Sequence, residues 1–279
     1  MIGKLKRLIW LWSQCFKSMR NVKTVTPFLI YAILQIVLLY SLSNFSQKPF
    51  SSLLVPIIQK TFGDPALHYP NFYVVLTSMF SQINIILSGS VGIIFVGMAT
   101  HLFALNFKDR KTNLGDAFKS TITNYLVLFL IWILVTALTF LMIMGLPIIL
   151  KKFFQPEYFL GRIFDMVGLL FGIIITSMFA YTTVLVILDR KKLAQALSNT
   201  FSIFFTNAGT SFFLIAVPTA FYFPISYLTR RIDLIFSKFS PETIVTILAL
   251  GIVITFITSY FQVGSITRFY LLLNERKRY

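Results

Sequence analysis

The residues able to carry chemistry are few in this sequence and lie far apart. It has two histidines, His68 and His101, one cysteine, Cys15, and nine acidic residues that stand singly along the chain. No HExxH, GxSxG, Gly-rich phosphate loop or Ser–His–Asp order occurs in it. Metal, nucleophile and phosphate chemistry each need several such residues to converge. We therefore predict a non-enzymatic protein with no catalytic, cofactor-binding or metal-binding residues.

Four single side chains near the apolar segments each allow a functional interpretation. His101 is a candidate proton site or ligand, but no acidic residue stands at helical spacing from it, which favours an interfacial histidine. Asp165 is a candidate substrate-binding acid, although the helix dipole also favours an acid where a helix begins. Arg268 is expected to extend to lipid headgroups. Cys15 is expected to pack as a small apolar residue, with reversible acylation as the alternative.

Amide side chains also occur in the apolar segments, at Gln35, Gln82, Asn84 and Gln262. An amide in hydrocarbon needs a hydrogen-bond partner, so we expect bonds between helices that contribute on the order of 1 kcal/mol each. Gln82 and Asn84 are also candidates to line a polar cavity. Structural bonding is the preferred interpretation, because the two residues point to different helix faces.

Backbone-shaping residues mark two of the apolar segments. Pro218 and Pro224 each remove a backbone donor and bend a helix, so they indicate either plain kinks or a broken helix beside a binding site. A small residue recurs at every fourth position of another segment, at Gly168, Gly172, Thr176 and Ala180. Such a track lets a second backbone approach closely. We favour packing within one bundle over a homodimer face, and the oligomeric state stays open.

The elements that position these residues follow from the composition. Of 279 residues, 57% are hydrophobic and 12% are charged, and the mean hydropathy is +0.80. A soluble domain is about one quarter charged, so these values indicate a polytopic membrane protein. We predict a single all-α integral membrane domain over residues 1–279, a bundle of six transmembrane helices with amphipathic helices at the interface. Apolar stretches of about 20 residues place the spans at about 26–46, 82–106, 126–149, 164–188, 209–229 and 243–270.

The charge balance is strongly basic, with 25 Lys and Arg against 9 Asp and Glu and a formal net charge of +16. We expect no nucleic-acid binding, because most stretches between the charges are long enough to enter a bilayer. If both termini are cytoplasmic, the inside segments hold about twice as many Lys and Arg as the outside loops, which favours this orientation. Residues 1–24 are then a basic amphipathic interfacial helix. Residues 47–73 form an external loop, whose 50–62 stretch is expected to lie along the outer leaflet.

A short phrase recurs in the sequence, as SQCFKS at 13–18 and GDAFKS at 115–120. Stripes of apolar or small residues at helical spacing begin at Leu114 and at Leu193, each just after a DRK triplet. They comprise Ala117, Phe118, Thr121, Ile122, Tyr125 and Leu126 in one copy and Ala196, Leu197, Thr200, Phe201, Phe204 and Phe205 in the other. A weaker N-terminal copy aligns Trp12, Cys15, Phe16 and Met19.

We interpret each copy as an amphipathic helix at the cytoplasmic interface that turns into a transmembrane helix. Three such hairpins, related by an axis along the membrane normal, would fill the chain. The alternative is that interfacial helices share these spacings by chance.

Three strings carry a resemblance to a known family: YTTVLVILDRKKLAQALSNTFSIFF at 181–205, MGLPIIL at 144–150 and TRFYLLLNERKR at 267–278. The chain resembles the membrane domain attached to some bacterial glycerophosphodiester phosphodiesterases, and related six-span bacterial membrane proteins. The resemblance implies a helical bundle in the cytoplasmic membrane and no catalytic residues in the membrane part. The sequence lacks the soluble phosphodiesterase domain of that family.

Two functions are compatible with these features. The first is a membrane scaffold or interaction protein linked to envelope or lipid homeostasis, whose basic helices hold anionic lipids at the cytoplasmic face and a membrane or cytoplasmic protein partner. The second is a carrier for a lipid or small amphiphile, which would use the proline-containing segment and a cavity between hairpins. A dry, well-packed bundle with a stable partner indicates the scaffold. A cavity open to one side indicates the carrier.

Overall fold

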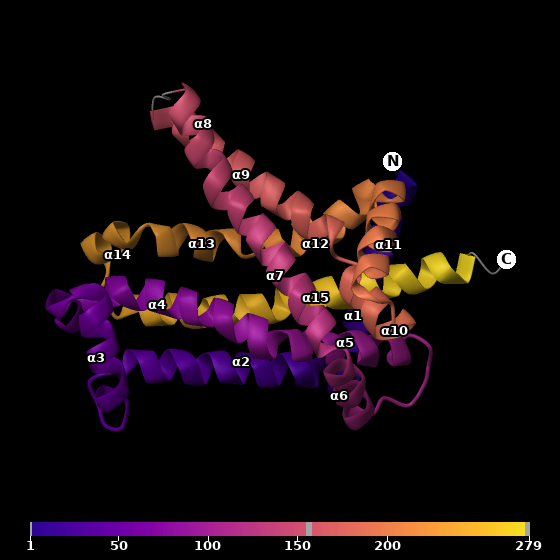
Figure 1. Ribbon diagram of the computed structural model, residues 1–279, viewed down its shortest axis with the longest axis horizontal. Helices are drawn as coiled ribbons and strands as arrows, with labels where there is room; N and C mark the ends of the chain where they lie inside the picture. Colours follow the sequence, from indigo (N-terminus) through magenta and orange to yellow (C-terminus); the bar gives the residue numbers. More distant parts are fainter. Residues whose placement is uncertain (1, 155–157, 277–279) are drawn as a thin grey trace. The chain divides into compact units, whose positions relative to one another are not determined.

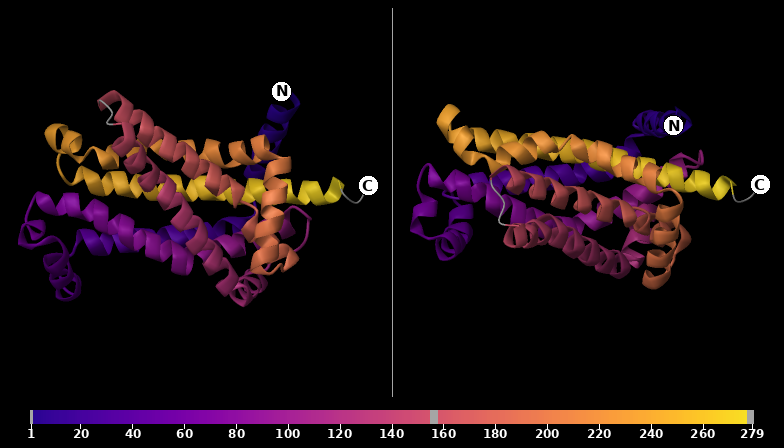
Figure 2. Two further views of the ribbon diagram at one scale, coloured as in Figure 1. Left: turned by 45° about the horizontal axis from the view of Figure 1, so that its top comes forward. Right: turned by 90° about the horizontal axis from the view of Figure 1, so that it is seen from above.

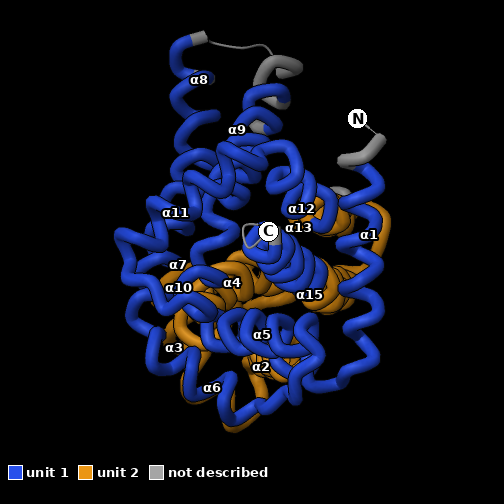
Figure 3. Tube along the Cα trace, turned by 90° about the vertical axis from the view of Figure 1, so that its right-hand side faces the viewer, with its two compact units in different colours: residues 1–27, 93–218, 260–279 blue, residues 28–92, 219–259 orange. Residues whose placement is uncertain are grey.

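The computed structural model describes residues 2–154 and 158–276, which are helical and contain no strand. The chain divides into two compact units (Figure 3). Unit 1 comprises Met1–Pro27, Ile93–Pro218 and Tyr260–Tyr279, and unit 2 comprises Phe28–Gly92 and Thr219–Ser259. The single integral membrane domain expected over residues 1–279, which would include both units, stays a prediction.

The helices are labelled in Figure 1. The first half of the chain contains α1 (Ile2–Ser18), α2 (Val22–Ser43), α3 (Phe50–Phe62), η1 (Asp64–Leu67), α4 (Asn71–Leu87), η2 (Ser88–Gly92), α5 (Ile93–Asn106), α6 (Leu114–Thr123) and α7 (Tyr125–Phe140). The second half contains η3 (Leu141–Gly145), α8 (Leu146–Phe154), α9 (Tyr158–Met178), α10 (Thr182–Asp189), α11 (Leu193–Thr206), α12 (Ala208–Ala220), α13 (Phe223–Arg230), α14 (Ile232–Lys238) and α15 (Thr243–Arg276). η2 and η3 are single π-helical turns within longer helices.

Among the residues that the structure describes, five helical segments are long and apolar enough to cross a membrane: Val22–Ser43, Asn71–Asn106, Tyr125–Leu150, Met166–Asp189 and Thr243–Glu275. The pair α11 and α12, bent by 97°, makes a sixth if it is counted as one span. Two predicted boundaries were wrong. The segment expected at 82–106 begins at Asn71, directly after Pro70, and the helix expected over 1–24 ends at Ser18.

The segment expected at 209–229 is not one helix. α12 ends at Ala220 and α13 begins at Phe223, so two short helices replace the predicted span. Pro218 lies inside α12 and Pro224 lies in the first turn of α13. Because a proline lacks a backbone N–H, two of them six residues apart weaken the hydrogen-bond ladder at this place. The structure shows that the helix is broken here, and a binding site beside the break stays a prediction.

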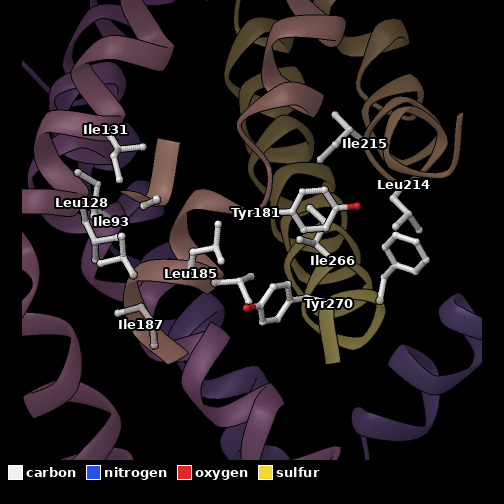
Figure 4. Packing of buried hydrophobic residues seen from close by; sticks show 14 of the residues in the cluster. Ile93, Leu128, Ile131, Tyr181, Leu185, Ile187, Leu214, Ile215, Ile266 and Tyr270 are labelled. Atoms are coloured by element: carbon white, nitrogen blue, oxygen red, sulfur yellow. The ribbon is translucent and has the colours of Figure 1, made fainter. Parts of the chain in front are cut away.

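The core of unit 1 gathers side chains from many helices around α10 (Figure 4). Leu185 and Ile187 of α10 are buried with Leu128 and Ile131 of α7. Tyr181, just before α10, is fully buried, and its hydroxyl shares a hydrogen bond of 2.7 Å with the Ser211 hydroxyl. This bond satisfies polar groups that would otherwise be costly to bury.

The α7–η3–α8 arm and α9 lie antiparallel side by side in all views (Figures 1 and 2). Gly168 and Gly172 of α9 permit this approach. A Cβ added at Gly168 would lie 2.7 Å from Pro147 Cγ, and one at Gly172 would lie 2.8 Å from Ile143 Cγ1. The small-residue track therefore packs within the chain at these two positions, as the sequence analysis favoured.

The core of unit 2 includes the segment predicted as an external loop. α3 has the bounds expected for it, and Pro56 lies inside the helix. Ile58 of α3 is fully buried, whereas Leu53 and Ile57 are exposed. Phe45 stacks on Phe72, with ring centroids 4.0 Å apart.

Candidate functional site

Three helices, α1, α6 and α11, are each followed after a turn by an apolar helix, α2, α7 and α12 respectively, and we call the three the elbow helices. Each has a buried column of residues spaced by one helical turn. The columns comprise Leu8, Leu11, Cys15 and Ser18 in α1, Ala117 and Thr121 in α6, and Ala196, Thr200 and Phe204 in α11. The helical spacing predicted from the sequence is therefore present in the structure.

The predicted stripe is wider than the buried column, and its second half faces outwards. Phe118 is 49% exposed, Ile122 is 44% exposed and Phe205 is 69% exposed. In α1, Phe16 is 62% exposed, although its ring lies 4.8 Å from that of Phe261. α1 and α6 thus pack one column on the protein and leave neighbouring apolar side chains uncovered, whereas in α11 Phe201 is half-buried and only Phe205 is exposed. Uncovered large apolar side chains on a helix are typical of a face that meets lipid or a partner.

The repeated FKS phrase occupies this uncovered face. In both copies the residue before Phe is fully buried, as Cys15 and Ala117. The following lysines, Lys17 and Lys119, are exposed beside their phenylalanines. Each phrase therefore presents one large apolar group and one cation side by side. α11 has Leu197 and Ser198 at the corresponding positions, so it lacks the cation.

An asparagine forms the elbow itself, a feature that the sequence analysis missed. Asn124 follows α6 and donates from its side-chain amide to the Ser120 carbonyl at 2.8 Å. Asn207 follows α11 and donates in the same way to the Ile203 carbonyl at 3.2 Å. The backbone carbonyl of each asparagine then accepts a bond from the next helix. The signal in the sequence was an asparagine near the end of each stripe, Asn124 just before Tyr125 and Asn207 two residues after Phe205.

The elbow after α1 is built differently, from contacts between distant segments of unit 1. Asn21 donates to the Asn106 side-chain oxygen at 2.8 Å, and Asn106 donates to the Ser18 hydroxyl at 2.9 Å. Lys23 donates to the Thr112 carbonyl at 2.9 Å. These bonds tie the end of α1 to the segment after α5.

Replacing Asn124 by Ala should weaken the elbow after α6. The change leaves a helix-end carbonyl without its side-chain donor, so we expect a loss of about 1 kcal/mol in stability. Thr123→Ala is the matched control, because exposed Thr123 bonds only within its own helix. Thermal unfolding of the purified protein measures both. Equal melting temperatures for the two variants would contradict a bracing role for Asn124.

The two DRK triplets end their preceding helices with a similar backbone. Asp109 and Arg190 have left-handed φ values of 52° and 51°. The Arg110 amide donates to the Leu105 carbonyl at 2.9 Å, and the Arg190 amide donates to the Leu185 carbonyl. The likeness therefore extends from sequence to local geometry, although the left-handed residue is shifted by one position.

A polar groove lies beside the second triplet, between the end of α10, α11 and α15. We call it the α11 groove. The part lined by all three segments, which we call the main cavity, has a volume of about 420 Å³. Its polar lining includes Asp189, Lys191, Asn199, Ser202, Thr206 and Asn274, and Leu185, Ile203 and Leu273 add apolar wall. A second, more open hollow of about 540 Å³ shares Lys191 and Asn199 and continues along Gln195 and Ser198.

The carboxylate of Asp189 is held in place at this groove. It accepts a hydrogen bond through Oδ2 from the hydroxyl of Tyr270, a buried residue of α15. In the part of the chain that the structure describes, Asp189 and Lys191 form no ion pair with each other. Opposite charges thus lie at one groove without neutralising one another. Asp189 and Lys191 belong to the second DRK triplet. The other residues that line the groove are uncharged, so the charge pattern of the sequence did not point to them.

Arg268 does not extend outwards as expected. It is 16% exposed, and its guanidinium lies 5.2 Å from the Trp10 ring centroid and 5.6 Å from that of Phe107. Its Nη1 also lies 3.5 Å from Glu275 Oε1. Two aromatic rings thus hold the cation within unit 1, because ring faces attract a guanidinium. The arginine fastens α1 to α15.

The other single candidates do not assemble into a site. His101 is half-buried in α5, and its Nδ1 has no hydrogen-bond partner among the described residues. The side chain of Asp165 lies outside the described residues. Within residues 2–154 and 158–276, no group of three His, Cys, Asp or Glu side chains is placed to hold a metal ion.

The amides mostly bond between helices. Gln35 of α2 donates to Asn84 Oδ1 of α4 at 2.7 Å, and Gln262 of α15 donates to the Ile215 carbonyl of α12 at 3.3 Å. Gln82 instead bonds within its own helix, to Ser78. Three of the four amides thus join helices, as expected, while Gln82 does not.

Cys15 is fully buried, so its packing role agrees with the sequence interpretation. Burial raises the pKa of its thiol to about 12. A raised pKa suppresses the thiolate that acylation needs.

Comparisons of the chain with protein-family models, with curated proteins and with solved structures find no match.

Proposed function

We propose that this chain is a non-enzymatic, multi-pass scaffold or interaction protein of a bacterial inner membrane. It crosses the membrane six times, with α12 and α13 in the broken fifth span, and both termini are cytoplasmic. The elbow helices lie at the cytoplasmic face, where they bind anionic lipid and a protein partner. We also propose that the chain belongs to the group it resembles, the membrane domains attached to some bacterial glycerophosphodiester phosphodiesterases and related six-span proteins.

The observation that carries this proposal is the uncovered Phe–Lys pair on two elbow helices. An exposed ring can enter the boundary between headgroups and acyl chains while the adjacent ammonium meets lipid phosphates. Each basic residue near an anionic surface contributes roughly 1 kcal/mol. Two such helices therefore form a basic, partly apolar surface that suits a lipid face or an acidic partner.

Lys119→Gln should reduce the amount of anionic lipid that the purified protein retains. One phosphate-binding cation is removed, so we expect a decrease of about threefold to fivefold at low salt. Lys60→Gln is the control, since Lys60 is an exposed lysine of α3 on the opposite side in the proposed topology. Native mass spectrometry of the protein released from its own membrane measures the retained lipid. Equal lipid retention by both variants would show that Lys119 does not bind anionic lipid.

The same measurement tests the function. A stoichiometric protein partner supports the scaffold. A retained lipid or small molecule without a partner supports the second candidate, a carrier, which the α11 groove and the broken helix at Pro218 and Pro224 favour. If the carrier hypothesis holds, Pro218→Ala together with Pro224→Ala should abolish ligand exchange.

A further inference from the structure

The charges of the α11 groove suggest what it binds. Asp189 and Lys191 are the charged residues of its main cavity, and no ion pair joins them within the described residues. A ligand that carries only a negative charge would be repelled by Asp189, and one that carries only a positive charge would be repelled by Lys191. A ligand with both charges satisfies the two residues together.

The hydrogen bond from Tyr270 also orients the Asp189 carboxylate, which can accept a further bond from a ligand. Tyr270 is buried and donates to Asp189 Oδ2, which fixes the carboxylate and leaves Oδ1 as an acceptor at the groove. An ammonium with N–H donors can use that oxygen, whereas a quaternary ammonium cannot. The amides of Asn199 and Asn274 and the hydroxyl of Ser202 offer further bonds to phosphate and ester oxygens, whereas the Thr206 hydroxyl already donates to the Ser202 carbonyl.

The remaining wall favours an amphiphile. Leu185, Ile203 and Leu273 line the same cavity. Phe205, in the last turn of α11, is 69% exposed. An apolar chain attached to the ligand would therefore find apolar side chains next to the polar groups.

We propose that the α11 groove binds the headgroup of a phospholipid that carries a primary ammonium and a phosphate. The ammonium donates to Asp189, and the phosphate meets Lys191 and the neighbouring amides. This goes beyond the scaffold role, because it assigns a specific lipid site that needs no protein partner. It rests only on the placement of these helices in a membrane.

The test measures lipid preference in the full chain. The protein is exchanged into nanodiscs that contain equal parts of phosphatidylethanolamine, phosphatidylcholine and phosphatidylglycerol, and native mass spectrometry counts the bound lipids. We expect phosphatidylethanolamine to be retained about threefold to tenfold over phosphatidylcholine, whereas phosphatidylglycerol also binds to the basic elbow helices of the proposed scaffold. Asp189→Asn should remove its advantage over phosphatidylcholine, whereas Lys191→Gln should weaken all three lipids alike.

The first DRK triplet supplies matched controls. Asp109→Asn and Lys111→Gln change exposed residues with a related backbone that do not line the main cavity. These variants should keep the preference of the unmodified protein. Equal retention of all three lipids, or an equal loss in the control variants, would overturn the proposal.

A final experiment distinguishes a phospholipid headgroup from a free small molecule with the same charged groups. Soluble phosphoethanolamine is added to the delipidated protein, and binding is followed by calorimetry. Binding that depends on Asp189 without any lipid preference in nanodiscs would identify a free metabolite and overturn the lipid assignment. Loss of the protein partner without loss of lipid preference would count against the scaffold role alone.

Discussion

Gly97→Ala is expected to destabilise the protein by about 2 kcal/mol, because the added methyl group has no room. A Cβ at Gly97 of α5 would lie 2.5 Å from Thr121 Cγ2 and 3.0 Å from Thr121 Oγ1. Thr121 is fully buried in α6, and its hydroxyl already bonds to the Ala117 carbonyl at 2.9 Å. A β-branched side chain held in this way has few other rotamers to adopt. The elbow helix α6 must therefore move away from α5.

Two further variants make the Gly97 test specific. Gly209→Ala is the matched control, because a Cβ there meets nothing within 4 Å, and the change should be neutral or stabilising by up to about 1 kcal/mol. Thr121→Ala in the Gly97→Ala background should restore much of the loss, since it removes both clashing atoms. Thermal unfolding in one detergent compares the three. The absence of rescue would show that α5 and α6 do not meet at these residues.

Arg268→Ala is expected to expose Cys15 to thiol reagents. The guanidinium lies near the rings of Trp10 and Phe107, and two such contacts contribute about 1–2 kcal/mol together. Cys15 lies on the same helix as Trp10, and burial raises the pKa of its thiol to about 12. The thiol is then almost entirely protonated at pH 8, so labelling of the unmodified protein should be very slow.

Release of α1 returns the pKa of Cys15 towards its ordinary value, and the thiolate population rises. A loss of about 1–2 kcal/mol in docking corresponds to an open population about fivefold to thirtyfold larger, so we expect an increase of that size in the rate of maleimide labelling. Cys15 is the only cysteine in the sequence, so the label reports α1 directly. Arg110→Ala, which removes an exposed arginine, should leave the rate unchanged.

Gly264→Ala offers a second route to the same readout. A Cβ at Gly264 would lie 3.0 Å from Cys15 Sγ and 2.9 Å from the tip of the Phe103 ring. It should also speed the labelling of Cys15, without any change in charge. If neither variant increases the labelling rate, α1 is not fastened to α15 by this cluster.

Several elements could be predicted from the sequence because their causes are local. The bounds of α3 and the first residues of α6, α11 and α15 agree with the predicted segments, since apolar length and helical spacing act over a few turns. The break near Pro218 and Pro224 is also local, because each proline lacks a donor wherever it stands. The five or six apolar helices, and with them the class of multi-pass membrane protein, follow from composition alone.

Only the tertiary structure decided which face of each helix is covered and which polar groups meet. A period of 3.6 residues predicts a stripe, but it does not separate Thr121, which is buried, from Ile122, which is exposed. The rings around Arg268 and the walls of the α11 groove come from segments far apart in the chain, and no spacing encodes such proximity. Burial and pairing depend on those neighbours, so the site became visible only once the helices were placed in three dimensions.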